Sequence, residues 1–282
     1  MRIFKRKLYE KLLDWKNNRS GRTAVLIEGA RRVGKSTLAR QFAENEYESY
    51  VMIDFSIVKK DILELFDSIA DLDYFFLQLQ FRLGVSLKER KSLIIFDEVQ
   101  MCPKARQAIK HLVADGRYDY IETGSLISIR KNVKDIVIPS EEEKMVLHPL
   151  DYEEFKWALG DTTTIAQMRM IFEKRLSMGD AVTRKLMRDF RLYMAVGGMP
   201  QAVCEYLETN NLMDVDRVKR GIIQLYEDDF YRIDQSGRIS MLFDAIPAQL
   251  SSNASRFQVA SALGDNVDSE KTLQLISELR ES

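Results

Sequence analysis

The stretch that decides the fold is GARRVGKS at residues 29–36, a full match to the pattern G-x-x-x-x-G-K-[ST]. It follows an apolar run, TAVLIE at residues 23–28, and opens a segment that carries Leu38 and Phe42 at helical spacing. A loop between a strand and a helix suits phosphate binding, because its glycines let successive N–H groups face an anion at the positive end of the helix. The sequence therefore predicts a site for a nucleoside triphosphate.

Two side chains of this loop have predicted roles of their own. Lys35 is expected to reach the β and γ phosphates, and the Ser36 hydroxyl is expected to coordinate Mg²⁺. The residues predicted to contact the nucleotide are Gly29, Ala30, Arg31, Arg32, Val33, Gly34, Lys35, Ser36 and Thr37.

A second motif, SLIIFDE at residues 92–98, is an apolar run that ends in two acids. The carboxyl end of a buried strand lies at the ligand crevice of an open α/β sheet, so Asp97 is predicted to hold Mg²⁺ through water and Glu98 to polarise the attacking water. The next run ends in Thr123, whose hydroxyl is expected between the phosphate loop and the acidic strand. This set indicates a nucleoside triphosphate hydrolase and weighs against a small-molecule kinase.

The order of apolar runs and helical patterns indicates an α/β fold with a parallel sheet between two layers of helices. The predicted strands are residues 23–28, 50–55, 92–97, 118–123 and 144–148. After Pro149 only helical periodicity follows, broken at Gly197-Gly198-Met199-Pro200. The predicted organisation is a P-loop core (1–150), a helical lid (151–235) and a partial winged-helix-like segment (236–282) with helices at 239–250, 257–263 and 269–279.

Composition narrows the function further. The 282 residues hold 42 Lys plus Arg, 43 Asp plus Glu, two Cys and two His, which excludes a disordered chain, a polybasic nucleic-acid binder, a disulfide scaffold and a histidine-rich metal site. No apolar run suits a membrane helix or a signal peptide, so we expect no membrane partner and a cytoplasmic location. We expect solvated basic faces on the N-terminal helix, which includes Arg6, and on a helix that begins at Pro103 and carries Lys104, Arg106 and Lys110.

The segments GARRVGKSTL, LIIFDEVQ, ETGSLISI, LHPLDYEEF and VGGMP, in this order, resemble the prokaryotic AAA+ ATPases of the archaeal-ATPase type, in which an AAA domain precedes a domain of unknown function. The resemblance implies ATP as the nucleotide, Lys35 and Ser36 as Walker A residues, Asp97 and Glu98 as the Walker B pair and Thr123 as the first sensor. It also implies that Gly198 and Pro200, in a G-x-P element of the lid, pack near the adenine. A simple turn between lid helices is the alternative for this element.

The chain departs from these relatives in two ways. They usually carry a Gly-Arg pair before the last strand, whereas residues 139–144 read PSEEEK, so Arg130 is the nearest candidate for an arginine finger. They also usually continue into a longer C-terminal domain, so we expect the chain to be truncated.

Three hypotheses for function remain open at this point. The first is an ATPase whose hydrolysis moves the core relative to the lid. The second is a nucleotide-gated switch with little turnover that acts through a homo-oligomer, a protein partner or DNA. The third is DNA binding through the tail, which the acidic residues Glu270, Glu278 and Glu281 disfavour because phosphates attract positive charge.

Overall fold

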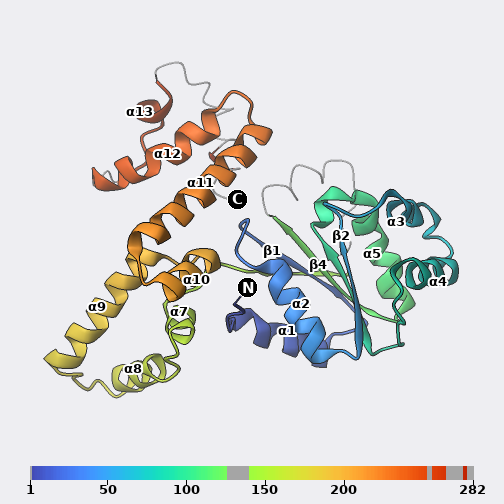
Figure 1. Ribbon diagram of the computed structural model, residues 1–282, viewed down its shortest axis with the longest axis horizontal. Helices are drawn as coiled ribbons and strands as arrows, with labels where there is room; N and C mark the ends of the chain where they lie inside the picture. Colours follow the sequence, from blue (N-terminus) through green and yellow to red (C-terminus); the bar gives the residue numbers. More distant parts are fainter. Residues whose placement is uncertain (1, 126–139, 253–255, 265–275, 278–282) are drawn as a thin grey trace. The chain divides into compact units, whose positions relative to one another are not determined.

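The computed structural model describes residues 2–125, 140–252, 256–264 and 276–277 (Figure 1). The chain divides into two compact units, Met1–Val218 and Lys219–Ser282. The predicted arginine finger, Arg130, lies outside the described residues, as does most of the helix predicted at 269–279.

The first unit is built on a five-stranded sheet in the order β2-β3-β4-β1-β5, in which every pairing is parallel. The strands are β1 (Ala24–Gly29), β2 (Ser49–Asp54), β3 (Ser92–Asp97), β4 (Asp119–Ser125) and β5 (Glu142–Val146). The predicted parallel α/β fold is thereby confirmed. The last strand starts two residues before its predicted position, because Glu142 pairs with Ala24 in the sheet and its side chain is buried rather than solvated.

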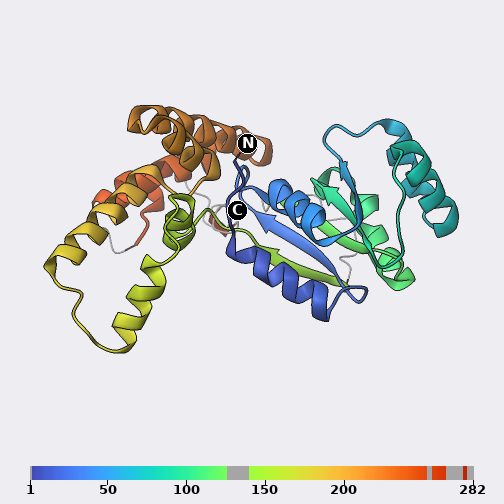
Figure 2. The ribbon, with the colours of Figure 1, turned by 60° about the horizontal axis from the view of Figure 1, so that its bottom comes forward.

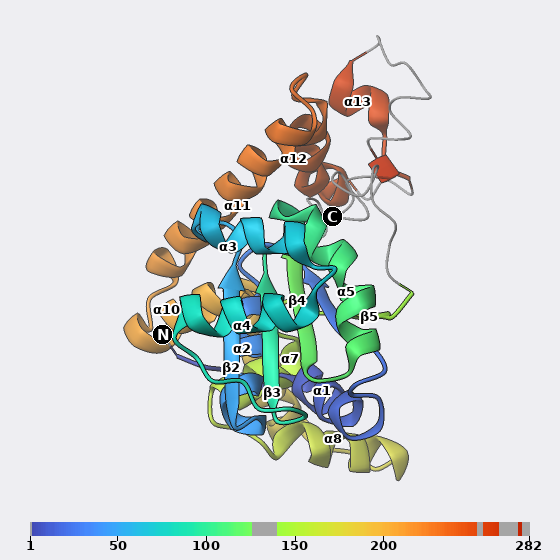
Figure 3. The ribbon, with the colours of Figure 1, turned by 90° about the vertical axis from the view of Figure 1, so that its right-hand side faces the viewer.

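Helices cover both faces of this sheet, so every residue of β1, β3 and β4 is buried (Figure 3). One layer consists of α1 (Lys7–Asn18) and α2 (Lys35–Glu46), and its core includes Trp15 and Phe42. The opposite layer consists of α3 (Lys60–Leu65), η1 (Phe66–Ser68), α4 (Leu72–Leu83), η2 (Val99–Met101) and α5 (Pro103–Asp115). Its core is rich in phenylalanine, with Phe66 edge-on to Phe75 at 5.3 Å between ring centroids.

After β5 the chain enters the helices predicted to form the lid, of which α7 is the first (Figure 2). These helices are α7 (Tyr152–Ala158), α8 (Thr164–Glu173), α9 (Asp180–Val196) and α10 (Pro200–Thr209), as the helical periodicity after Pro149 predicts. Phe155 and Val196 centre a separate apolar cluster that also holds Leu150 and Phe4. Phe4, in the segment that precedes α1, therefore packs among the helices of the predicted lid.

The second unit contains the greater part of α11 (Leu212–Ile233), then α12 (Arg238–Ser251) and α13 (Val259–Leu263). Helices α12 and α13 correspond to the segments predicted at 239–250 and 257–263. Phe230 and Phe243 pack with their ring centroids 5.1 Å apart and join α11 to α12. Among the described helices, none combines the length and the apolar character needed to cross a bilayer.

Candidate functional site

The loop between β1 and α2 adopts a backbone that requires its glycines. Gly34, immediately before α2, has φ = 99°, in the left-handed region that favours glycine. At Gly29 the constraint is space, since a Cβ would lie 2.3 Å from the carbonyl oxygen of Leu147. Arg32 is also left-handed, with φ = 68°. A backbone that alternates between left-handed and right-handed conformations turns successive N–H groups toward one point. This is the geometry of the anion-binding turn known as a nest.

Lys35 begins α2 and is almost fully buried. Its ammonium donates hydrogen bonds to the carbonyl oxygens of Gly29 and Ala30, each at 3.0 Å. Burial lowers the pKa of Lys35, and the nearby charges of Glu98 and Asp97 oppose that shift. An anionic phosphate would compensate this desolvated cation better than two neutral carbonyls do.

The second motif lies directly against this loop. The Ser36 hydroxyl donates to Asp97 Oδ1 at 2.7 Å, and the Thr123 hydroxyl donates to the same oxygen. Strand β4 lies between β1 and β3, so Thr123 lies between the loop and the acidic strand, as its position in the sequence predicts. Alternate residues of a strand share a face, and Asp97 follows Ile95 onto the face that α2 covers. The structure thus brings Ser36, Asp97 and Thr123 into one hydrogen-bonded group.

Glu98 completes the group at the end of β3. Its backbone is left-handed, with φ = 54°, and its N–H donates to the Thr123 hydroxyl at 3.3 Å. Strained conformations of this type in non-glycine residues cluster at functional sites. The half-buried carboxylate accepts a hydrogen bond from the Gln100 amide. Gln100 was not predicted from the sequence, and no local pattern marks it, because its role depends on the turn that η2 makes.

A pocket lies beside the loop and takes residues from three parts of the first unit. It is lined by Arg2, Ile3, Phe4, Arg6, Arg32, Gly34, Thr37, Leu38, Gln41 and Pro200. Of the two predicted lid residues, Pro200 lines this pocket. Gly198 instead packs on the segment between β5 and α7, where its carbonyl oxygen accepts a hydrogen bond from the Leu150 amide at 2.7 Å.

Two predictions about basic residues are wrong. Arg6 does not belong to a solvated face: it is 6% exposed and reaches the pocket, because it precedes α1 and turns inward. Arg106 is 2% exposed and binds both oxygens of the buried Glu142 carboxylate, at 2.9 and 3.1 Å. Neither inward turn follows from helical spacing, since each is imposed by a carboxylate far away in the chain.

Comparison with known families assigns two parts of the chain. Residues 21–156 match the family model described as AAA domain, and residues 187–281 match the model described as Domain of unknown function (DUF8612). The chain thus carries an AAA domain followed by a domain of unknown function. The AAA domain contains the phosphate loop, both acids of the second motif and Thr123, whereas Arg6 precedes it and Pro200 lies in the following domain.

Two solved structures are similar to the chain, and the first of them shares this fold. The Walker-type ATPase of Pyrococcus abyssi is similar over 99% of this chain and 89% of its own, with a TM-score of 0.54 and 17% identity. DnaA from Aquifex aeolicus, bound to AMPPCP, is similar over 98% of this chain and 88% of its own, with a TM-score of 0.40 and 12% identity. No curated protein matches the chain. At 17% identity the likeness to the Pyrococcus ATPase shows only the fold of this chain.

Proposed function

We propose that the protein is a Mg²⁺-dependent ATPase whose turnover changes the contact between the core and the lid. The observation that carries this proposal is the hydrogen bond of 2.7 Å between Ser36 and Asp97, which joins the phosphate loop to the acidic strand. Thr123 and Glu98 meet at the same point, so residues from three segments of the AAA domain converge on one place.

The residues present fit a triphosphate and its metal. Lys35 and the backbone N–H groups at the start of α2 would bind phosphate oxygens. Ser36 and Asp97 offer a hydroxyl and a carboxylate oxygen in contact, and Mg²⁺ prefers oxygen ligands of this kind. The bound Mg²⁺ would neutralise part of the charge on the phosphates.

Glu98 is the proposed general base. Its carboxylate would accept the proton of a water molecule as that water attacks the terminal phosphate. Its backbone N–H donates to the Thr123 hydroxyl, which ties the position of the base to that of Asp97. The proposed role of Thr123 is therefore to hold the two acids in register and to contact the γ-phosphate or the water.

The pocket supports a link between the nucleotide and the lid. Its walls come from the N-terminal segment, from α2 and, through Pro200, from the lid. A base and ribose bound there would contact the core and the lid together. We propose ATP as the nucleotide, with Thr37 and Pro200 beside its adenosine end and Gly198 supporting Pro200 through its bond to Leu150.

A nucleotide-gated switch with little turnover is the second candidate. The observation that favours it is the hydrogen bond from Gln100 to Glu98, because it occupies a carboxylate oxygen that a general base needs to accept the proton of water. In this version ATP controls assembly with a second copy, a protein or DNA.

The proposal is tested by equilibrium titration of the protein with a fluorescent ATP analogue, with and without Mg²⁺. We expect saturable binding that Lys35→Ala abolishes and that ATP displaces more effectively than GTP. Binding that survives Lys35→Ala, or the lack of any binding, would refute the nucleotide site. Steady-state phosphate release then separates the two candidates, since an ATPase turns over and a switch retains its nucleotide.

A further inference from the structure

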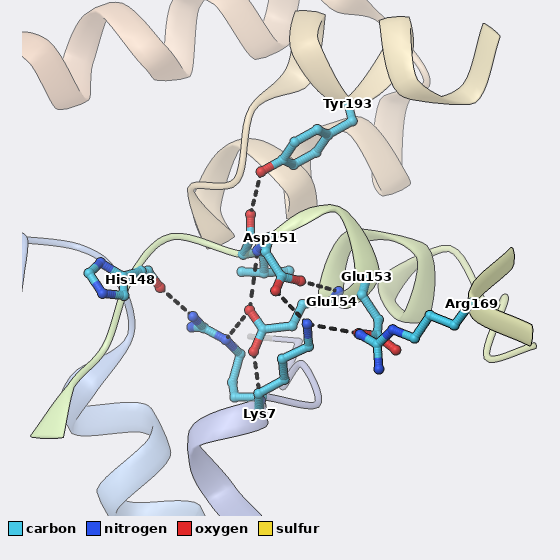
Figure 4. A network of polar contacts seen from close by, with 9 residues as sticks. Lys7, His148, Asp151, Glu153, Glu154, Arg169 and Tyr193 are labelled. Carbon is cyan, nitrogen blue, oxygen red and sulfur yellow. Dashed lines mark hydrogen bonds and ion pairs between the residues drawn. The ribbon is translucent and has the colours of Figure 1, made fainter. Parts of the chain in front are cut away.

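Arg6 joins three segments that lie far apart in the sequence. Its guanidinium donates to the carbonyl oxygen of Val33, at 3.1 Å, and to that of His148. Its Nε lies 3.3 Å from the Glu154 carboxylate and forms an ion pair with it, without the geometry of a hydrogen bond. Figure 4 shows His148 and Glu154 converging on this point from the end of β5 and from α7. The phosphate loop, the entry to the lid and the first lid helix thus share one buried cation.

At the loop, Arg6 fixes the peptide that joins Val33 to Gly34. A trans peptide is planar, so its carbonyl and its N–H point in opposite directions. Holding the Val33 carbonyl on Arg6 therefore aims the Gly34 N–H to the other side of the loop, away from Arg6. The left-handed Gly34 follows this peptide directly and the left-handed Arg32 lies one residue before it, so a partner that holds the peptide also holds the turn of the loop. Arg6 provides that partner.

At the lid, Arg6 contacts a residue that organises the start of α7. Glu154 and Asp151 form a capping box, in which the Glu154 N–H donates to Asp151 at 2.9 Å and the Asp151 N–H donates to Glu154 at 3.3 Å. Glu154 also accepts a hydrogen bond of 2.6 Å from the backbone N–H of Lys7. The adjacent Leu150 carbonyl accepts from the Tyr193 hydroxyl of α9 at 2.9 Å. A displacement of Glu154 therefore also moves Asp151 and the adjacent Leu150, the segment that two further lid helices contact.

We propose that Arg6 is a positioning residue that couples the occupancy of the phosphate loop to the first lid helix. A phosphate bound to the Gly34 N–H polarises the same peptide whose carbonyl Arg6 holds, so the two hydrogen bonds strengthen each other. Because Arg6 is also paired with Glu154, a more tightly held Arg6 restricts the position of Glu154 and of the start of α7. This inference rests on the proposed nucleotide binding and adds to it the route by which the lid responds.

Because coupling between two sites acts in both directions, it can be measured as the effect of a lid substitution on nucleotide affinity. If the loop and α7 are coupled, a change at Glu154 alters nucleotide affinity, just as bound nucleotide alters α7. Glu154 does not belong to the residues that line the pocket, so an effect of its substitution on affinity passes through another residue. Glu154→Gln removes the charge that faces Arg6 while keeping a residue that completes a capping box.

Lys7 offers a matched control on the same helix turn. Its ammonium pairs with Asp151 and with Glu153, the latter at 2.8 Å, so it also ties α1 to the start of α7. The Lys7 side chain is 40% exposed, whereas that of Arg6 is buried, and Figure 4 shows the Lys7 contacts at the start of α7. If Arg6 and Glu154 merely hold the lid in place, Lys7→Gln should imitate their substitution.

The experiment measures the dissociation constant of a non-hydrolysable ATP analogue with Mg²⁺ for the wild type, Glu154→Gln, Arg6→Lys, the double variant and Lys7→Gln. We expect Glu154→Gln to weaken binding about fivefold or more, the lower end of typical allosteric coupling. Once Arg6 is replaced, Glu154→Gln should have little further effect, and Lys7→Gln should stay within about twofold of the wild type. Thermal melting without nucleotide checks that each variant is folded, and if Arg6→Lys unfolds, Glu154→Gln and Lys7→Gln decide.

Three results would overturn the coupling: unchanged affinity in Glu154→Gln, losses that multiply in the double variant, or an equal loss in Lys7→Gln. In each case the wild type still binds nucleotide through Lys35, so the proposed function stands. A wild type that binds no nucleotide overturns both proposals together.

Discussion

Replacing Gly198 with alanine tests how closely the lid packs on the segment that leads into it. An alanine Cβ at this position would lie 2.1 Å from the Leu150 carbonyl oxygen and 3.0 Å from its carbonyl carbon and its nitrogen. The first distance is more than 1 Å short of ordinary contact, and the obstacle is backbone, which cannot swing aside as a flexible side chain can. The start of α10 must therefore move away from Leu150.

The cost follows from two contributions. Forced overpacking in a tight core costs about 1–3 kcal/mol. The movement also breaks the hydrogen bond from the Leu150 amide to the Gly198 carbonyl, which contributes about 1 kcal/mol. We expect the local contact to lose about 2–4 kcal/mol, which corresponds to a fall of about 30- to 1000-fold in an equilibrium constant.

Native-state hydrogen exchange of the Leu150 amide measures this loss directly, because that amide is the donor of the broken bond. The control is Gly221→Ala, since Gly221 lies inside α11 with open space where a Cβ would be placed. That substitution should stabilise its helix by up to about 1 kcal/mol and leave the Leu150 amide unchanged. Leu150 protection in Gly198→Ala within about threefold of the wild type would refute the reasoning.

Two further predictions concern the buried charges under α5. Burial, with the nearby charge of Glu142, raises the pKa of Glu122 well above its usual value of 4.5. The folded protein then holds this proton more tightly than the unfolded chain, so its stabilising effect is complete below about pH 4.5 and is lost as the pH rises toward the folded pKa. At pH 8 the free energy of unfolding of Glu122→Gln should exceed that of the wild type by about 1 kcal/mol or more, and at pH 4 the two should be equal. A difference between the two proteins that does not vary with pH would contradict this. In urea denaturation, Arg106→Leu should lower the free energy of unfolding by about 3–5 kcal/mol, because Glu142 is left buried without its cation. The control Lys104→Ala removes an exposed pair with Asp67 and should lower it by less than about 1 kcal/mol. Similar losses in the two variants would argue against a stabilising buried pair.

The fold was predictable where local pattern and local structure coincide. Continuous apolar runs placed β1 and β3 to within two residues, because a strand buried on both faces is mostly apolar. Strand β5 fits this rule less well, since it opens with Glu142, an acid whose burial depends on Arg106 of a distant helix. The sequence pattern carries no record of that pairing.

The candidate site shows the same division. Ser36, Asp97 and Thr123 were predictable because Asp97 and Thr123 lie at or near the carboxyl ends of their strands and Ser36 follows a strand through the phosphate loop. Parallel strands bring their carboxyl ends to one edge of the sheet. Arg6 was not predictable, because it acts through contacts set by the tertiary fold. Gln100 was not predictable either, because its contact with Glu98 depends on the turn that η2 makes. From sequence alone, a basic residue just before an amphipathic helix is predicted to be solvated. Only the tertiary structure shows which carboxylate lies beside it.

The most direct test of the proposed ATPase compares single-turnover phosphate release from bound ATP by the wild type and by Glu98→Gln, with nucleotide binding measured in parallel. The account predicts that both proteins bind ATP with similar affinity and that Glu98→Gln releases phosphate at least about 100-fold more slowly, the usual loss when a general base is removed. Equal rates of release from the two proteins would contradict it.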